Sequence, residues 1–238
     1  MEEMRLQKYV SDCGLMSRRA AEKEIELGHF KVNGQVAEIG QKINPNEDAV
    51  EYKGKLIEGG SKKVYVMLYK PRGYVTTMSD EEGRKCIPEL LEDLPERVYP
   101  CGRLDMDSEG LLILTNDGEV ANKLMHPKHH VEKIYHVKIK GEIEPEKLGM
   151  LNGPMVLDGY KIKPVKVSII ERKEGATILK FVLSEGRNRQ IRKMCEQAEL
   201  TITRLKRVAV GELTIGMLRP GKWKYMNYNE ISILKNMS

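Results

Sequence analysis

An aspartate beside an arginine, just before an apolar run, is the feature of this sequence best suited to chemistry. Arg103 and Asp105 lie in the segment 102–105, which continues through Ser108 into the apolar residues 111–114. An apolar run bounded by polar residues predicts a buried strand. The loop before it would then be held rigidly, with Asp105 partly shielded from water. We therefore consider Asp105 as a nucleophile or a general base.

Two other interpretations of this aspartate stay open. Asp105 could cap a turn of its loop or pair with Arg103, which is the commoner use of a loop aspartate. Asp107 is a competitor for the chemical role, because spacing alone cannot separate the two carboxylates. No metal motif offers another route: the cysteines (Cys13, Cys86, Cys101, Cys195) are scattered, and we expect free thiols and no metal site.

Positive charge is concentrated near the C-terminal end. The 238 residues carry a net charge of +5, yet residues 187–224 hold ten Lys and Arg against three Asp and Glu. Such a region attracts polyanions, although a solvated basic face would look the same. A helix predicted over 190–198 would place Arg189, Arg192 and Lys193 on one side. A guanidinium facing Asp105 would keep that carboxylate ionised.

A tyrosine in a predicted strand is a second candidate. Residues 131–137 alternate as a strand, which places Tyr135 on the same face as Lys133 and Val137. The ring could stack on a nucleic-acid base or simply fill the core.

Patterning predicts two domains of an α+β protein. Residues 1–57 read as a small module of two helices and a hairpin turning at Asn33 and Gly34, and residues 58–63 read as a linker. In the module, Arg18, Arg19 and Lys31 are candidate phosphate contacts. Residues 64–238 are strand-rich without regularly interleaved helices, which favours a mostly antiparallel sheet.

Composition fits a protein of the reducing cytoplasm. Hydrophobic residues make up 40% and charged residues 32%, as in ordinary globular proteins. No apolar run approaches the ~20 residues of a membrane span, and the charged N-terminal residues do not resemble a signal peptide.

The ordered set of motifs resembles the bacterial ribosomal RNA pseudouridine synthases of the single-site type. Residues 4–57 resemble an S4 RNA-binding module, and residues 64–238 a pseudouridine synthase domain. The segments that carry the resemblance are 70–74, 99–105 with 108–112, 132–135, 185–192, 204–207 and 220–223. One departure is Glu199, which stands where the family usually ends a helix with glycine.

The resemblance implies an isomerisation of uridine to pseudouridine without a cofactor. Asp105 would be catalytic, Tyr135 would stack on the target uracil, and Arg192 would face the Asp105 carboxylate, with Arg103 as further support. Asp105 would act either by attacking the sugar or base or by promoting a glycal intermediate. RNA contacts would come from these basic residues: Arg18, Arg19, Lys31, Arg189 and Lys193.

The resemblance favours 23S ribosomal RNA as the target, with 16S RNA as the alternative. We expect a monomer whose substrate is free ribosomal RNA or a large-subunit precursor particle. Two rival functions remain. One is a non-catalytic S4-type protein of ribosome assembly, and the other is a metal-free hydrolase that uses Asp105 as a base on a nucleoside.

Overall fold

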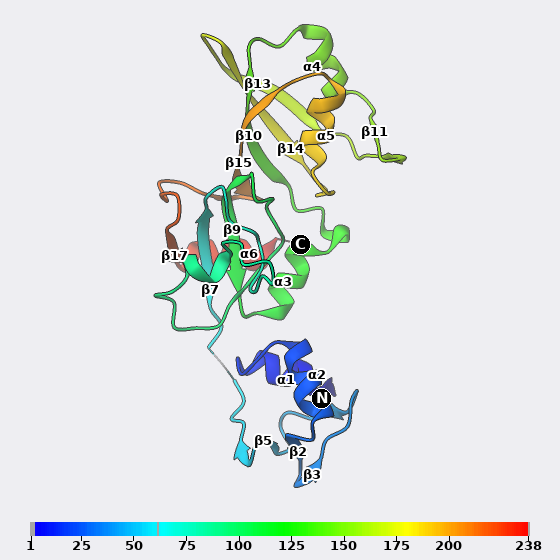
Figure 1. Cartoon of the computed structure of the whole chain (residues 1–238), viewed down its shortest axis with the longest axis vertical. Helices are drawn as coiled ribbons and strands as arrows, with labels where there is room; N and C mark the ends of the chain where they lie inside the picture. Colours follow the sequence, from blue (N-terminus) through cyan, green and yellow to red (C-terminus); the bar gives the residue numbers. More distant parts are fainter. Residues whose placement is uncertain (1–2, 61, 238) are drawn as a thin grey trace. The chain divides into compact units, whose positions relative to one another are not determined.

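The computed structural model describes residues 3–60 and 62–237, and the chain divides into two compact units (Figure 1). The first unit is Met1–Val64 with Asn116–Gly118, and the second is Tyr65–Thr115 with Glu119–Ser238. The division after residue 64 falls at the end of the segment predicted as a linker. Within the described ranges, no helix is long and apolar enough to cross a lipid bilayer.

The first unit packs two short helices against strands. Helix α1 (Leu6–Asp12) buries one apolar side, and helix α2 (Arg18–Glu26) begins where the hydroxyl of Ser17 accepts a hydrogen bond from the amide of Ala20, 3.1 Å away. Phe30 is fully buried in the core that helices and strands share. This arrangement confirms the predicted helix–helix–hairpin pattern. The strands are β1 (Met4–Arg5), β2 (Phe30–Val32), β3 (Gln35–Val36), β4 (Lys42–Ile43), β5 (Val50–Tyr52) and β6 (Lys55–Leu56).

The second unit is built on one large sheet. Among its described residues, nine strands pair along the path β13-β14-β10-β15-β9-β7-β17, with β16 beside β15 and β8 beside β9. All these pairings are antiparallel except that of β9 with β15, which confirms the predicted α+β class. The main strands are β7 (Tyr65–Lys70), β9 (Glu109–Thr115), β10 (Lys133–Lys140), β13 (Lys166–Lys173), β14 (Ala176–Leu183) and β15 (Ile202–Val210). The short strands are β8 (Tyr99–Pro100), β11 (Val156–Leu157), β12 (Tyr160–Lys161), β16 (Leu213–Thr214) and β17 (Trp223–Tyr225).

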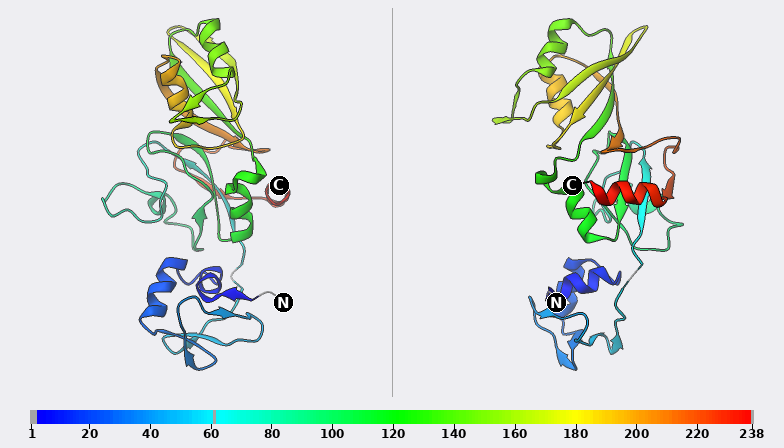
Figure 2. Two further views of the ribbon diagram at one scale, coloured as in Figure 1. Left: turned by 90° about the vertical axis from the view of Figure 1, so that its right-hand side faces the viewer. Right: turned by 180° about the vertical axis from the view of Figure 1, so that it is seen from behind.

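Helices cover this sheet in two groups, each over its own core (Figures 1 and 2). Helices α4 (Pro145–Asn152) and α5 (Gln190–Gln197) lie on β10, β13 and β14, where Phe181 and Met194 are fully buried. Helices α3 (Gly118–Met125) and α6 (Tyr228–Asn236) close the second core against β7 and β9. Two short 3-10 helices cover Ile87–Leu90 and Pro127–His129.

The parallel pairing of β9 with β15 depends on a glycine. Gly110 lies opposite Arg207 and has a φ of +116°, a conformation that L side chains rarely adopt. A Cβ at Gly110 would stand 2.2 Å from the carbonyl oxygen of Arg207, so any side chain there would separate the strands. The glycine thereby lets the strand that follows Asp105 run directly beside β15.

Some elements were not predicted from the sequence. The sequence patterns do not predict the strand β15 or the helices α4 and α6. Strand β15 is not recognisable from its sequence, because the charged side chains of Arg204 and Lys206 interrupt its apolar pattern. Helix α4 has little contrast between its two sides and buries only Leu151.

We predict that Glu199→Gly raises the free energy of unfolding by up to about 1 kcal/mol. Glu199 follows α5 with a φ of +53°, and the amides of Glu199 and Leu200 bond to the carbonyls of Glu196 and Cys195. This is a Schellman ending, in which glycine avoids the strain of the left-handed conformation. Urea denaturation measures the change. Glu196→Gly, inside the helix, is the matched control and should lower stability by about 1 kcal/mol; destabilisation by both variants would contradict the prediction.

Candidate active site

A cleft of about 540 Å³ opens in the second unit beside the segment 104–108, here called the aspartate loop. Asp105 lines it from this loop, and Tyr135 lines it from β10. The residues 186–192, which lead into α5, form another wall. The segments that carry the predicted site residues therefore meet at one hollow, although they are far apart in the chain.

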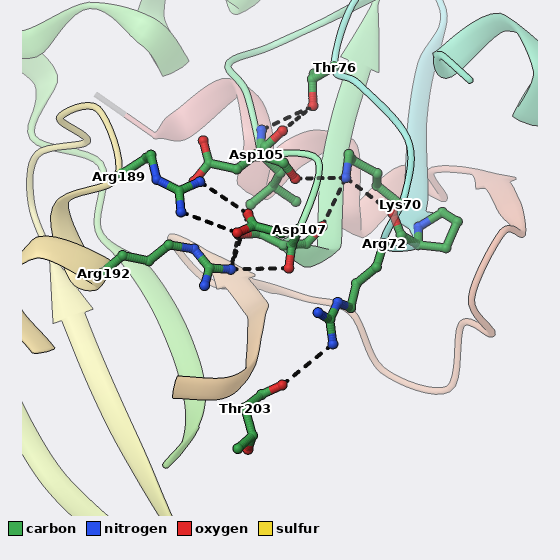
Figure 3. A network of polar contacts seen from close by, with 11 residues as sticks. Lys70, Arg72, Thr76, Asp105, Asp107, Arg189, Arg192 and Thr203 are labelled. Carbon is green, nitrogen blue, oxygen red and sulfur yellow. Dashed lines mark hydrogen bonds and ion pairs between the residues drawn. The ribbon is translucent and has the colours of Figure 1, made fainter. Parts of the chain in front are cut away.

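A fully buried lysine holds the aspartate loop in place (Figure 3). Lys70, the last residue of β7, donates from Nζ to the carbonyl oxygens of Pro71 at 3.1 Å, Asp105 at 3.0 Å and Ser108 at 2.9 Å. An ammonium group has three N–H donors and no acceptor, so these three carbonyls satisfy it completely. Both ends of the turn that presents Asp105 are thus tied to the sheet.

Burial makes this ammonium group unusually acidic. Desolvation lowers the pKa of Lys70 to about 8, although the nearby charges of Asp105 and Asp107 oppose the shift. Lys70 is therefore still mostly protonated at neutral pH and can supply all three hydrogen bonds.

A threonine fixes the other side of the same loop. The Thr76 hydroxyl donates to the carbonyl oxygen of Leu104 at 2.6 Å and accepts from the amide of Leu104 at 3.1 Å. The amide of Gly73 donates to the carbonyl oxygen of Met106 at 2.7 Å. The segment 70–76 thus holds the backbone on both sides of Asp105, whose own side chain is 30% exposed.

Arg189 and Arg192 face the carboxylates of the loop (Figure 3), but the arginine next to Asp105 is not the one expected from the sequence. Arg189 Nη1 lies 3.8 Å from Asp105 Oδ2, and Arg189 Nη2 lies 3.2 Å from Asp107 Oδ2. Arg192 Nη2 lies 3.1 Å from Asp107 Oδ1 and also donates to the Asp107 carbonyl and the Ser108 hydroxyl. The expectation that Arg192 faces Asp105 is therefore corrected: Arg189 does so, and Arg192 supports the loop through Asp107.

The backbone explains this exchange of roles. Arg189 precedes α5 with a φ of +52°, outside the helix, whereas Arg192 lies within its first turn. Both side chains leave the same end of the helix, so either could reach a carboxylate of the loop. Which arginine reaches which aspartate depends on the loop geometry, and the sequence spacing does not encode it.

Tyr135 lies between the core and the cleft. It is 9% exposed, belongs to the core under α5 and also lines the cleft. Beside it, Lys133 donates from Nζ to the carbonyl of Val131 at 2.9 Å. Burial, and next the charge of Arg207, lower the pKa of Lys133 to about 8. The cleft wall thus presents an aromatic ring next to a partly desolvated cation.

Sequence reasoning gave no role to three residues that build this site. Arg207 is 3% exposed and donates from Nε to the carbonyl of Leu111 at 2.8 Å, which joins β15 to β9. Its alternation with the apolar Leu205 and Ala209 was a usable signal of burial. Lys70 likewise continues an apolar run, whereas Thr76 has no sequence signal.

The remaining predicted residues lie on surfaces. Arg103 is exposed and lines the cleft, while the amine of Lys193 forms an ion pair with the carboxylate of Asp158. The other candidate phosphate contacts lie in the first unit and are all exposed: Arg18, Arg19 and Lys31.

Comparison with known proteins agrees with this site. Residues 64–197 match the family model described as RNA pseudouridylate synthase, and residues 4–48 match that of the S4 domain. The chain is 39% identical to the ribosomal large subunit pseudouridine synthase B of Bacillus subtilis strain 168 over 237 residues, which cover 98% of this chain and 96% of that protein. An RNA pseudouridine synthase of Aquifex aeolicus strain VF5 is 40% identical over 236 residues, which cover 98% and 94%. A crystal structure of a pseudouridylate synthase has a TM-score of 0.69 at 28% identity and covers 97% of this chain and 99% of that one.

The chain therefore belongs to the RNA pseudouridylate synthase family and carries an S4 domain at its N-terminal end. This confirms the family resemblance, the fold and the class of enzyme predicted from the sequence motifs.

We predict that Lys70→Met flattens the rise of unfolding free energy between pH 8 and about 10. The folded protein releases the Lys70 proton near pH 8, whereas the unfolded chain keeps it until its ordinary pKa of 10.5. The unfolded state thus binds more protons in this interval, and stability contributed by this group rises with pH. Denaturant titrations across the interval measure the slope.

Lys140→Met, at the exposed end of β10, is the control and should keep the wild-type slope. The Lys70 variant should also lose turnover by at least about tenfold, because the aspartate loop loses two tethers, at Asp105 and Ser108, and misplaced groups react slowly. An unchanged slope in Lys70→Met would show that this amine is not the group that titrates.

Proposed function

We propose that this enzyme converts one specific uridine of 23S ribosomal RNA into pseudouridine, with Asp105 as the catalytic residue. The observation that carries the proposal is the position of Asp105. Its backbone is fixed by Lys70 and Thr76, and its carboxylate reaches the cleft opposite Arg189. The large-subunit target is supported by the name of the Bacillus subtilis relative, which aligns over nearly the whole of both chains. A 16S target is the alternative.

In the proposed reaction Asp105 promotes cleavage of the N-glycosidic bond of the uridine. It does so by attacking the sugar or base, or by assisting formation of a glycal. The uracil then turns in the cleft and rejoins the ribose through carbon 5. Reactant and product are isomers, so the overall reaction consumes no redox partner or group donor, and we propose that no cofactor takes part.

The residues around Asp105 hold the base and the charge. Tyr135 stacks on the uracil from the cleft wall, while Arg189 and Arg192 neutralise the two loop carboxylates from the side of α5. Arg103, which is exposed and lines the cleft, gives further support to the active site. A uridine within folded RNA must leave its stack to reach this cleft, and basic side chains stabilise the displaced strand.

The S4-like module, residues 1–57, supplies the second RNA contact through Arg18, Arg19 and Lys31, joined by the linker 58–63 to the catalytic domain 64–238. In that domain Lys193 is paired with Asp158, so its amine binds an RNA phosphate only after this ion pair has opened. We further propose a cytoplasmic monomer that acts on free ribosomal RNA or on a large-subunit precursor particle.

Asp105→Asn should abolish pseudouridine formation and leave RNA affinity within a few fold. The amide keeps the size of the side chain but supplies neither a nucleophile nor a base. Pseudouridine mapping on unmodified 23S and 16S RNA, each treated with wild type and variant, measures both reaction and target.

Asp107→Asn is the comparison variant, because Asp107 is the other carboxylate of the loop and is already bound by two arginines. It should slow the reaction without abolishing it. Turnover by Asp105→Asn near the wild-type rate would refute the assignment. If the wild type modifies neither RNA but binds it, a non-catalytic assembly role is favoured; reaction with free uridine would favour a nucleoside hydrolase.

Arg18→Glu with Arg19→Glu should weaken RNA binding at least about tenfold and reduce its dependence on salt. Both residues open α2 and are exposed, where each phosphate contact released adds to the salt slope. Affinity measured at several salt concentrations tests this. Lys55→Glu, a single charge reversal at an exposed position on β6 of the same unit, is the control and changes the net charge half as much. Equal loss in the control, or no loss in the double variant, would contradict a specific role for α2.

A further inference from the structure

A short hairpin stands out from the sheet beside α5 (Figures 1 and 2). It consists of β11 and β12, which pair Val156 with Lys161 and Leu157 with Tyr160. Two residues connect the strands, and both have left-handed backbones, so this is the tight turn that best matches the twist of a hairpin. The hairpin is thus a compact, well-defined projection.

Contacts at its base and tip hold this hairpin firmly. Leu157 and Ile162 are buried in the core under α4 and α5. At the tip, the carboxylate of Asp158 is paired with the amine of Lys193 on α5. The position of the hairpin relative to α5 is therefore fixed in the folded second unit.

An exposed aromatic ring and an arginine are stacked where the hairpin meets the cleft rim. The guanidinium carbon of Arg187 lies 3.0 Å from the ring centroid of Tyr160. Arg187 lines the cleft, and its amide donates to Gln190 Oε1 at 3.1 Å, which orients the residue. The residue Tyr160 is 39% exposed, so packing leaves part of it open to solvent.

Several cations lie near this stacked pair, and Oε2 of Glu185 lies 4.0 Å from Nε of Arg187. Lys161 is exposed next to Tyr160, and Lys163 Nζ lies 2.8 Å from Nδ1 of His130. Asp158, the acid of the turn, is already neutralised by Lys193. A nucleobase carrying its phosphate fits here, because a base can stack on the open face of a tyrosine ring or of a guanidinium plane while nearby cations pair with the phosphate.

We propose that Tyr160 and Arg187 form a platform for the base of an unpaired nucleotide flanking the target uridine. This inference rests on the proposed function and extends it to substrate selection. Flipping one uridine into the cleft unstacks its neighbours, and the platform offers a neighbouring base a new stacking partner. It recognises the presence of a base more than its identity, because every base has a π-face.

The test uses the full chain and a ribosomal RNA fragment that contains the modified uridine. Tyr160→Leu should lower kcat/KM about tenfold, within the range typical of one stacked base, whereas Tyr160→Phe keeps the ring and should stay within about twofold. Tyr228→Leu is the matched control, since Tyr228 is 85% exposed on α6. Thermal unfolding of all three variants checks that the fold is intact.

Abasic nucleotides placed one at a time around the target identify the stacked base. At one position, removal of the base should slow the wild type about tenfold and leave Tyr160→Leu unaffected, because both changes remove the same contact. If Tyr160→Leu stays within twofold of wild type on intact RNA, or if its effect multiplies with the abasic effect at every position, the platform is refuted.

Binding separates this outcome from failure of the proposed function. Should no pseudouridine form in either ribosomal RNA, the same variants and abasic fragments are compared by RNA affinity. The platform is supported independently of the reaction if wild type binds intact RNA more tightly than Tyr160→Leu does, and if this difference disappears when one particular base is removed. Equal affinities on every fragment overturn it.

Discussion

The active-site loop depends on one buried ammonium group. Removing the charge of Lys70 from water is unfavourable, and the lowered pKa is the sign of that cost. Three carbonyl oxygens offset it, two of them from the loop that carries Asp105. Because these acceptors must all face one point, the turn has little freedom. The Lys70 ammonium group thereby fixes the place where the reaction is proposed to occur.

Local patterns predicted most of the helices and strands, and long-range pairing hid the rest. The two helices and hairpin of the first unit, and the apolar strand after Asp105, follow from periodicity and turn residues. Strand β15 does not, because Arg204 and Lys206 occupy the side of the strand away from the core. Its identity as a central strand comes from pairing with β10 and β9, which no local window contains.

The candidate site shows the same division. Asp105 and Tyr135 stand in sequence motifs, which made them predictable. The sequence could not predict whether Arg189 or Arg192 faces Asp105, because both lie at the start of α5 and the position of the aspartate loop determines which one does. Thr76 could not be found either, since a threonine that accepts and donates at Leu104 looks like any other threonine in the sequence.

The parallel pairing of β9 with β15 has a consequence for synthesis of the protein. It joins Gly110 to Arg207, about a hundred positions later in the chain, and such distant pairings close late in folding. In a chain leaving the ribosome, most of the first unit is translated early, whereas the cleft beside Asp105 also needs Leu205 and Arg207 of β15, which line it. Fragments that stop before β15 therefore have no complete cleft.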